Sequence, residues 1–221
     1  FRSREDLERV AESVPDGPTT QRLQRWARET GATFVAGLPE RQGEAIYNSA
    51  VTVTPSGIAG IYRKTHLYYE EKLYFEPGDT GFSVLDITDR VGETYRLGVM
   101  ICFDWYFPES ARSLALQGAD IIAHPSNLVR SGCPSSMPVR ALENHVYTIT
   151  ANRIGAETNG QETLTFIGQS LICSPEGDVL LKAGRDETLV GAVEIDPAHA
   201  RDRQITAHNH LLADRRPEMY G

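Results

Sequence analysis

The chain has 221 residues, of which 40% are hydrophobic and 24% are charged, a balance typical of a folded domain and unlike that of a disordered segment. With 30 acidic and 22 basic side chains, the net charge is −8, which argues against nucleic acid or an anionic membrane as a partner. The longest apolar runs, such as LGVMI and ADIIA, are far shorter than the roughly 18–20 residues that span a bilayer.

Three cysteines are present, Cys102, Cys133 and Cys173, and they include no CxxC pair. An odd number without such a pair predicts neither a disulfide framework nor a zinc cluster. Cys133, in the expected exposed loop SGCPSS, and Cys173, in an apolar strand, are predicted to be incidental. His208 and His210 alternate in HNHLL without further ligands, so no metal site is expected. We recognise no signal peptide and expect a cytoplasmic protein with reduced thiols.

Helices and strands alternate along the first half of the chain. Apolar periodicity and turn residues predict a helix at 5–14, a helix at 20–31, a strand at 32–40, and two strands within 45–64 around a Pro-Ser-Gly turn. In the second helix Leu23, Trp26 and Ala27 fall on one face, and Gly31 ends it. The hairpin argues against a purely parallel sheet.

The same alternation continues through the second half. The pattern predicts a strand at 95–102, a helix beginning near Pro108, a strand at 119–126, a helix at 135–146, a strand at 147–155, further strands within 166–184 and 188–196, and a surface tail at 215–221. Helices must cover the faces of the sheets, so we expect one α/β domain with layered sheets between helices.

The segment GVMICFDWYFPES, residues 98–110, places Cys102 between an apolar strand and a helix. A side chain at such a turn is presented at the edge of a sheet, near the positive end of the helix dipole. That position lowers the pKa of a thiol and makes it a nucleophile, whereas free cysteines are also common as buried apolar residues. From this segment alone both interpretations of Cys102 stay open.

A second segment, GIYRKTHLYYEEKLYFEPGD at residues 60–79, places Lys64 just after an apolar strand. Most lysines in that position are simply solvated. A lysine that faces a site instead supplies a fixed cation, which lowers the pKa of a thiol and stabilises an oxyanion. YFEPGD reads as a turn that folds this loop back.

Four segments resemble the motifs of the nitrilase superfamily of carbon–nitrogen hydrolases: YRKTHL, EKLYFEPGD, GVMICFDWYFPESARSLALQGADIIAHPSN and RALENHVYTITANRIG. The similarity runs in order from VPDGPTTQRL to RRPEMY, and four ordered motifs are far more specific than any one of them. The resemblance implies a four-layer α-β-β-α sandwich, usually assembled as a homodimer or larger homo-oligomer through helix-to-helix contacts. The reaction that the resemblance implies requires no metal or organic cofactor.

The catalytic set of this family is a glutamate, a lysine and a cysteine. By resemblance, the lysine is Lys64 in YRKTHL and the nucleophile is Cys102 in MICFDW. A further family glutamate, which helps to hold the lysine and the substrate, matches Glu71 in EKLYFEPGD. Neighbouring Glu70 is the alternative if the alignment of this loop slips by one residue.

The remaining family glutamate, the general base, lies in a PE motif after an early strand, ahead of the region that matches FRSREDL. Glu5, Glu8 and Glu12 lie on the first expected helix, and Glu40 in GLPE belongs to the next strand of the family pattern. The resemblance therefore implies one N-terminally truncated domain over residues 1–221, which lacks the family's first strand, first helix and base-bearing strand. A catalytically silent subunit is the alternative that this leaves open.

On this interpretation the Cys102 thiolate attacks the carbon of a small amide. The Lys64 ammonium and the backbone N–H of Phe103 stabilise the oxyanion that forms. The glutamate base moves the proton to the leaving ammonia and then activates water against the thioester.

The residues after the nucleophile bear on the substrate. Nitrilases proper resemble CWE there, whereas this chain has CFD, which favours an amide over a nitrile. Relatives that act on N-carbamoyl amino acids place arginines two or three residues past the cysteine to bind a carboxylate, where this chain has Asp104 and Trp105. We therefore expect a neutral, partly aromatic pocket with Phe103 and Trp105. Asn127 in HPSN matches a pocket position of the family, with a turn residue as the alternative, and Tyr68 either borders the site or covers apolar surface. Nitrile and N-carbamoyl compounds remain alternative substrates.

A glutamine amidotransferase, which also carries a cysteine on a sharp turn, is a second enzyme class to consider. It requires a His–Glu pair late in the chain, and DPAHARDRQITAHNH supplies histidines without a clear strand. Dependence of thiol reactivity on Lys64 distinguishes the two classes.

Overall fold

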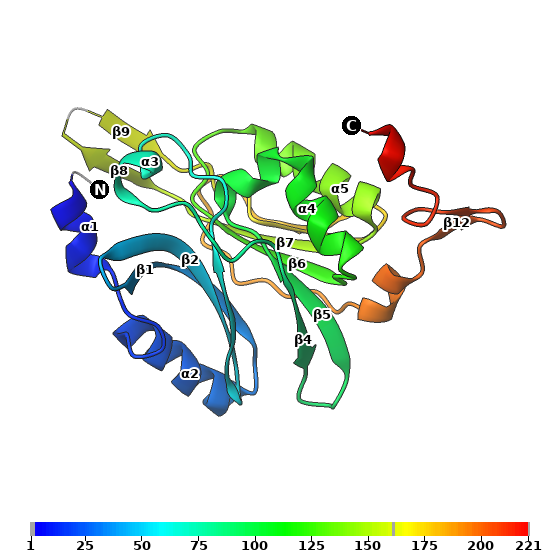
Figure 1. Ribbon diagram of the computed structural model, residues 1–221, viewed down its shortest axis with the longest axis horizontal. Helices are drawn as coiled ribbons and strands as arrows, with labels where there is room; N and C mark the ends of the chain where they lie inside the picture. Colours follow the sequence, from blue (N-terminus) through cyan, green and yellow to red (C-terminus); the bar gives the residue numbers. More distant parts are fainter. Residues whose placement is uncertain (1–2, 161, 221) are drawn as a thin grey trace.

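The computed structural model describes residues 3–160 and 162–220, in which short helices flank two main sheets (Figure 1). The helices are α1 (Arg4–Val10), α2 (Pro18–Thr30), α3 (Glu71–Tyr74), α4 (Pro108–Leu116) and α5 (Gly132–Asn144), and the 3-10 turns are η1 (Cys102–Tyr106), η2 (Pro197–Arg201) and η3 (Pro217–Met219). The longest, α2 and α5, have 13 residues. No helix of the described residues has the length and apolarity needed to cross a membrane.

The strands form two main sheets and two separate hairpins. An antiparallel sheet contains β1 (Phe34–Gln42), β2 (Ala45–Thr54) and β3 (Gly57–Arg63). The second sheet has the order β11-β10-β7-β6-β5-β4, with β4 (Val84–Thr88), β5 (Thr94–Val99), β6 (Ile121–Ser126), β7 (Tyr147–Asn152), β10 (Leu171–Cys173) and β11 (Val179–Lys182). Its central strands β5, β6 and β7 are parallel. The hairpins are β8 (Ala156–Asn159) with β9 (Glu162–Thr165), and β12 (Gln204–Thr206) with β13 (Asn209–His210).

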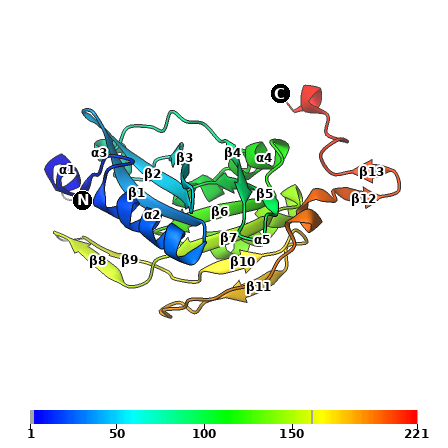
Figure 2. The same cartoon turned by 90° about the horizontal axis from the view of Figure 1, so that it is seen from below.

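Buried side chains divide the fold into four layers. Leu23 and Ala27 of α2 pack on β1 and β2, whereas Leu114 of α4 and Met137 of α5 pack on the six-stranded sheet. Between the two sheets, a third cluster joins β2 and β3 to the end of β5: Ala50, Tyr62, Val99 and Ile101. The result is the expected α-β-β-α sandwich (Figure 1). The C-terminal β12–β13 hairpin projects away from these layers (Figure 2).

Most predicted elements are confirmed within a few residues, and the exceptions have a physical explanation. Helix α5 begins at Gly132, earlier than predicted. Cys133 is therefore buried in a helix, and the expectation of an exposed loop was wrong. No strand forms in the predicted segment 188–196. Val190 there is fully exposed. The missing strand has a physical reason, because residues that favour strands form one only where a neighbouring strand edge is available to pair with.

Candidate active site

Cys102 lies at a sharp turn where the chain leaves β5 and enters η1. Its φ is +43°, a left-handed conformation that costs a residue other than glycine about 1–2 kcal/mol. The backbone N–H of Ile101 donates to Asp104 Oδ2 at 2.8 Å on one side. On the other, His124 Nε2 donates to the Cys102 carbonyl oxygen at 2.9 Å. Two buried side chains thus hold the cysteine in a backbone conformation that it rarely adopts.

His124 performs this task as a neutral ring. It lies in β6, and burial lowers its pKa to about 4. A neutral imidazole has one N–H, and because a carbonyl oxygen only accepts, that proton is on Nε2. Nδ1 lies 3.0 Å from Thr150 Oγ1 on the neighbouring strand, so the hydroxyl donates to it. The ring orientation is therefore fixed at both nitrogens.

Lys64 follows the last residue of β3, and its side chain is 0% exposed. Its Nζ donates to Glu71 Oε2 at 2.5 Å. The same carboxylate accepts the backbone N–H of Tyr68 at 2.7 Å and Asn48 Nδ2 at 3.0 Å. A buried ammonium requires such a counter-ion. The adjacent Glu70 occupies the position before α3 and makes none of these contacts.

The loop after α3 folds back onto Lys64, as YFEPGD predicts. The backbone N–H of Gly78 donates to the Lys64 carbonyl oxygen at 3.0 Å, and the backbone N–H of Glu76 donates to the Ile46 carbonyl oxygen at 2.9 Å. A Cβ atom at position 78 would lie 2.1 Å from the Arg63 carbonyl oxygen. Only glycine allows this close approach, which presses the loop against the end of β3.

The thiol of Cys102 lies within the electrostatic reach of Lys64 and Glu71. Burial raises the pKa of Cys102 above its ordinary value; the Lys64 ammonium and hydrogen bonds from the backbone of Asn127 and Phe103 lower it, and the Glu71 carboxylate raises it again. The structure thus brings together Cys102, Lys64 and Glu71, which come from three separate segments. The Lys64 ammonium is the largest of the influences that counter the effect of burial on this pKa.

A cavity of about 330 Å³ opens beside the sulfur. Cys102 lines it together with all four residues expected in the pocket: Tyr68, Phe103, Trp105 and Asn127. The ring centroids of Tyr68 and Phe103 are 5.0 Å apart, so the wall is aromatic as predicted. A hollow of about 400 Å³ along α2 has none of these groups among its lining residues.

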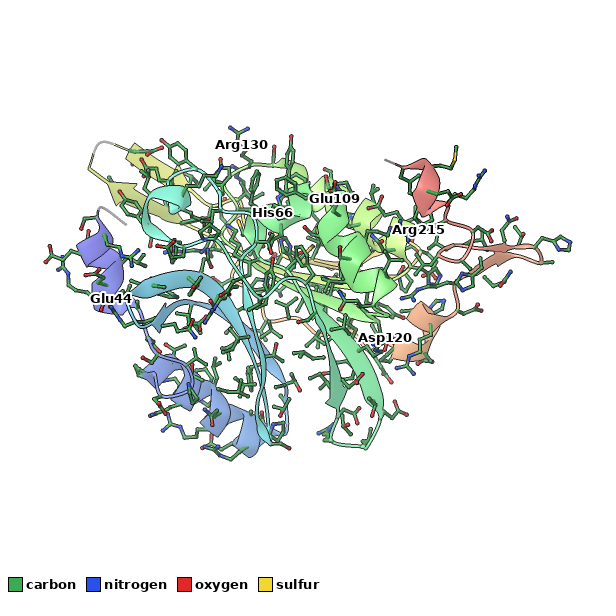
Figure 3. All side chains as sticks on the ribbon, viewed as in Figure 1. Glu44, His66, Glu109, Asp120, Arg130 and Arg215 are labelled. Atoms are coloured by element: carbon green, nitrogen blue, oxygen red, sulfur yellow. The ribbon has the colours of Figure 1, made fainter. Side chains whose placement is uncertain are left out.

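The expectation of a neutral pocket does not describe its rim. Of the described residues around the cavity, Arg130 alone carries a charge. Its Nε donates to the Tyr68 hydroxyl at 3.2 Å, and the side chain is at the outer edge of the molecule (Figure 3). The cavity therefore has an aromatic interior and a cationic mouth.

Glu40, which has the appearance of the missing base motif, is occupied elsewhere. It lies in β1, is buried, and accepts Arg63 Nη2 at 2.6 Å, Arg63 Nε at 2.9 Å and Ser49 Oγ at 2.6 Å. Glu12 accepts both the N–H and the hydroxyl of Thr19. These contacts agree with the sequence assignment, which gave neither residue the role of the base.

Four residues at or near the site were not identified as functional from the sequence: Asn48, Asp104, His124 and Arg130. Two of them have a local sequence signal that could have indicated a role. His124 is a histidine inside the apolar strand ADIIAHPS, and Asp104 stands two residues after the candidate nucleophile. Asn48 and Arg130 carry no comparable local signal, because their roles depend on partners in other segments.

A His–Glu pair does occur late in the chain, as the amidotransferase alternative requires. His199 Nε2 lies 3.0 Å from Glu176 Oε1. Neither residue is among those that line the cavity beside Cys102. His210, from the HNHLL segment, accepts the backbone N–H groups of Leu212 and Ala213 through Nδ1.

Comparisons with known proteins agree with this geometry. A family model described as carbon-nitrogen hydrolase matches residues 2–204. A nitrilase of Pyrococcus abyssi is 51% identical over 220 residues, which are 100% of this chain and 80% of that protein. An N-carbamoylputrescine amidase of Solanum lycopersicum is 33% identical over 98% of this chain and 76% of its own length. A mutant amidase from Nesterenkonia sp. AN1, solved with acrylamide added to its active-site cysteine, is 30% identical with a TM-score of 0.70, over 83% of this chain and 71% of that one.

Proposed function

The chain belongs to the carbon–nitrogen hydrolase family, the nitrilase superfamily, and on that premise we propose that it hydrolyses the non-peptide C–N bond of a small amide through a thioester on Cys102. The observation that carries this proposal is the cysteine on its strained turn, beside a cavity and within reach of the buried Lys64 ammonium.

In the first half of the reaction the Cys102 thiolate adds to the amide carbon, and the carbonyl oxygen becomes an oxyanion. The Lys64 ammonium and the Phe103 backbone N–H donate to that oxygen. Such a donor typically contributes about 3–4 kcal/mol to the transition state. When the oxyanion collapses, the C–N bond breaks, the nitrogen leaves with a proton as ammonia, and the acyl group remains on sulfur as a thioester. Water then cleaves the thioester and releases the carboxylic acid.

Glu71 is assigned to holding Lys64 in place and not to moving protons. Its two oxygens already accept three donors, which leaves little capacity to accept a further proton. We assign the proton transfers to a glutamate on a base-bearing strand outside residues 1–221, as the resemblance implies. In this proposal residues 1–221 contribute a single domain with the nucleophile, the cation and the pocket, and turnover is measured on a form that also carries the base-bearing strand.

An aromatic cavity beside the thiol supports an amide with a small aliphatic or aromatic acyl group. The relative described as an amidase supports the same choice, and the Michael addition of acrylamide to its active-site cysteine supports a nucleophilic role for the matching thiol. The relative described as a nitrilase, at 51% identity, favours a nitrile as the second candidate. A nitrile carbon reacts with the same thiolate, so both substrates need Cys102 and Lys64, and only their relative rates separate the two functions.

Ammonia release from compounds that share one propyl group tests the proposal: butyramide, butyronitrile and the N-carbamoyl derivative of propylamine. We expect the amide to have the highest kcat/KM. Cys102→Ala should abolish turnover, and Cys133→Ala, which removes a buried thiol outside the lining of this cavity, serves as the matched control. Full turnover by the Cys102→Ala protein would refute the mechanism, and faster hydrolysis of butyronitrile would replace the amide by the nitrile.

The proposal also includes a homodimer or larger homo-oligomer in the cytoplasm. Three large apolar side chains on α4 and α5 are about half exposed, Leu116, Val139 and Leu142, and would be covered by a helix-to-helix contact between copies. A cytoplasmic setting keeps the nucleophilic thiol reduced. Light scattering after gel filtration measures the number of subunits, and a monomeric mass would contradict this part.

A further inference from the structure

Asp104 is a fully buried carboxylate, 0% exposed, that accepts four hydrogen bonds. Oδ2 accepts the Ile101 backbone N–H at 2.8 Å and the Tyr62 hydroxyl at 2.7 Å. Oδ1 accepts the His66 backbone N–H at 3.1 Å and lies 2.8 Å from His66 Nδ1. The Tyr62 oxygen in turn accepts the Thr65 backbone N–H at 3.1 Å.

These donors belong to the two segments that carry the reacting groups. Ile101 directly precedes Cys102, whereas Tyr62 and His66 stand two residues before and two residues after Lys64. The first segment leaves the six-stranded sheet, and the second leaves the three-stranded sheet. One carboxylate therefore connects the sulfur-bearing turn of one sheet to the ammonium-bearing end of the other.

Aromatic packing keeps the donors in place. The ring of His66 stacks on Phe107 with centroids 3.8 Å apart, and the ring of Tyr62 stacks on Phe82 at 5.4 Å. A buried carboxylate is stable only when its oxygens are fully hydrogen-bonded. The four donors are likewise left without an acceptor if the carboxylate is removed.

We propose that Asp104 is a positioning residue that fixes the distance and direction between the Cys102 sulfur and the Lys64 ammonium. This inference rests on the proposed function, because it concerns the same site. Both oxygens of Asp104 are used by hydrogen bonds to the two segments that it joins, so it acts through those segments. Reacting groups displaced by about 1 Å lose about a hundredfold in rate, which sets the expected size of the effect.

The first experiment compares two buried aspartates in the complete gene product. Asp104→Asn keeps the shape of the side chain but replaces one acceptor by an amide N–H₂ that faces other donors. Asp120→Asn is the matched control, because Asp120 is 1% exposed, accepts the Arg96 backbone N–H at 2.9 Å and pairs with Arg201 at 2.8 Å. It lies far from His66 (Figure 3).

We expect Asp104→Asn to lower kcat for the best amide about a hundredfold with KM changed less than threefold, because substrate contacts remain. Asp120→Asn should leave both constants within threefold of wild type. Tyr62→Phe removes one of the four donors and should lower kcat about three- to tenfold. If Asp104→Asn fails to fold, Tyr62→Phe carries the test. A kcat within twofold of wild type in Tyr62→Phe, or equal losses in the two Asn variants, would overturn the proposal.

A second experiment does not depend on turnover, and so it separates a failure of this inference from a failure of the proposed function. It measures the rate at which iodoacetamide alkylates Cys102 in wild type, Asp104→Asn, Lys64→Met and the double variant. If Asp104 acts by holding Lys64 beside the sulfur, its replacement slows alkylation at least fivefold when Lys64 is present and less than twofold when it is absent. Equal effects in both backgrounds would show that Asp104 is merely structural.

Discussion

Replacing Glu71 by glutamine is expected to lower the free energy of unfolding by about 2–3 kcal/mol. The residue is the counter-ion of Lys64, whose side chain is 0% exposed, and the two atoms Nζ and Oε2 are 2.5 Å apart. Glutamine has nearly the same shape, so the change removes a charge without opening a cavity. The loss therefore measures the dependence of the buried ammonium on its partner.

The magnitude follows from the geometry of the pair. At 2.5 Å, and with an effective dielectric constant of about 20, the Coulomb attraction is about 7 kcal/mol. Desolvation of both ions offsets much of it, and breaking a buried pair typically costs about 3–5 kcal/mol. Glu71 is 26% exposed, and the glutamine oxygen still accepts Lys64. Asn48 can turn its amide to accept the new N–H₂. These three features lower the expected loss to about 2–3 kcal/mol.

Urea unfolding at pH 7.5 measures the difference, with Glu70→Gln as the control one residue away. The control should change the free energy of unfolding by less than about 0.5 kcal/mol. Because the Lys64 side chain is 0% exposed, 0.5 M sodium chloride should leave the loss in Glu71→Gln almost unchanged, whereas a pair of two exposed side chains would be screened. A loss no larger than that of the control, or one removed by salt, would refute the assignment of Glu71 as the counter-ion of Lys64.

Three further predictions concern the neighbours of this pair. Lys64→Met removes a cation that lowers the pKa of Cys102, so the midpoint of the pH profile of iodoacetamide alkylation should rise; an unchanged midpoint would contradict a direct effect of Lys64. Burial lowers the pKa of His124 to about 4, and the folded state then binds fewer protons than the unfolded state between that value and about 6.5. The free energy of unfolding should thus be highest above pH 6.5 and fall by up to about 3 kcal/mol toward pH 4, a decline that urea titrations should find reduced in His124→Asn. Arg130→Gln should change kcat/KM for butyramide less than threefold but lower it about tenfold for an amide with a distal carboxylate, and equal changes for both substrates would exclude a role at the mouth.

The elements that the sequence predicts well are those specified by local signals. The β2–β3 hairpin forms around the turn residues Pro55 and Ser56, and helix α2 ends at Gly31, whose φ is +74°. Both features depend on conformations that a few adjacent residues prefer. The predicted strand at 188–196 had only its apolar composition in its favour. Strand formation depends on a partner elsewhere in the chain, and none pairs with this segment in the described structure.

The residues of the site also differ in how far the local sequence predicts them. Motif resemblance points to Cys102 and Lys64 as the proposed reacting groups and to Glu71 as the residue that holds Lys64. Asp104 stands in the CFD motif, but its role does not follow from the motif, because its four donors come from both sheets and become neighbours only when the sheets pack. Asn48 likewise meets Glu71 from the middle of β2. Residues that do the chemistry can be predicted from local sequence, whereas residues that hold them in place require the fold.

Two adjacent cations show how the fold separates structural charge from functional charge. Successive side chains of a strand point to opposite faces, so Arg63 and Lys64 are directed to different surroundings at the end of β3. Arg63 pairs with both Glu40 and Asp79, and its charge is fully matched. Among the described residues Lys64 forms one ion pair, with Glu71, and that carboxylate also accepts two other donors. Lys64 also lies within electrostatic range of Cys102, where its ammonium counters part of the rise in the thiol pKa that burial causes.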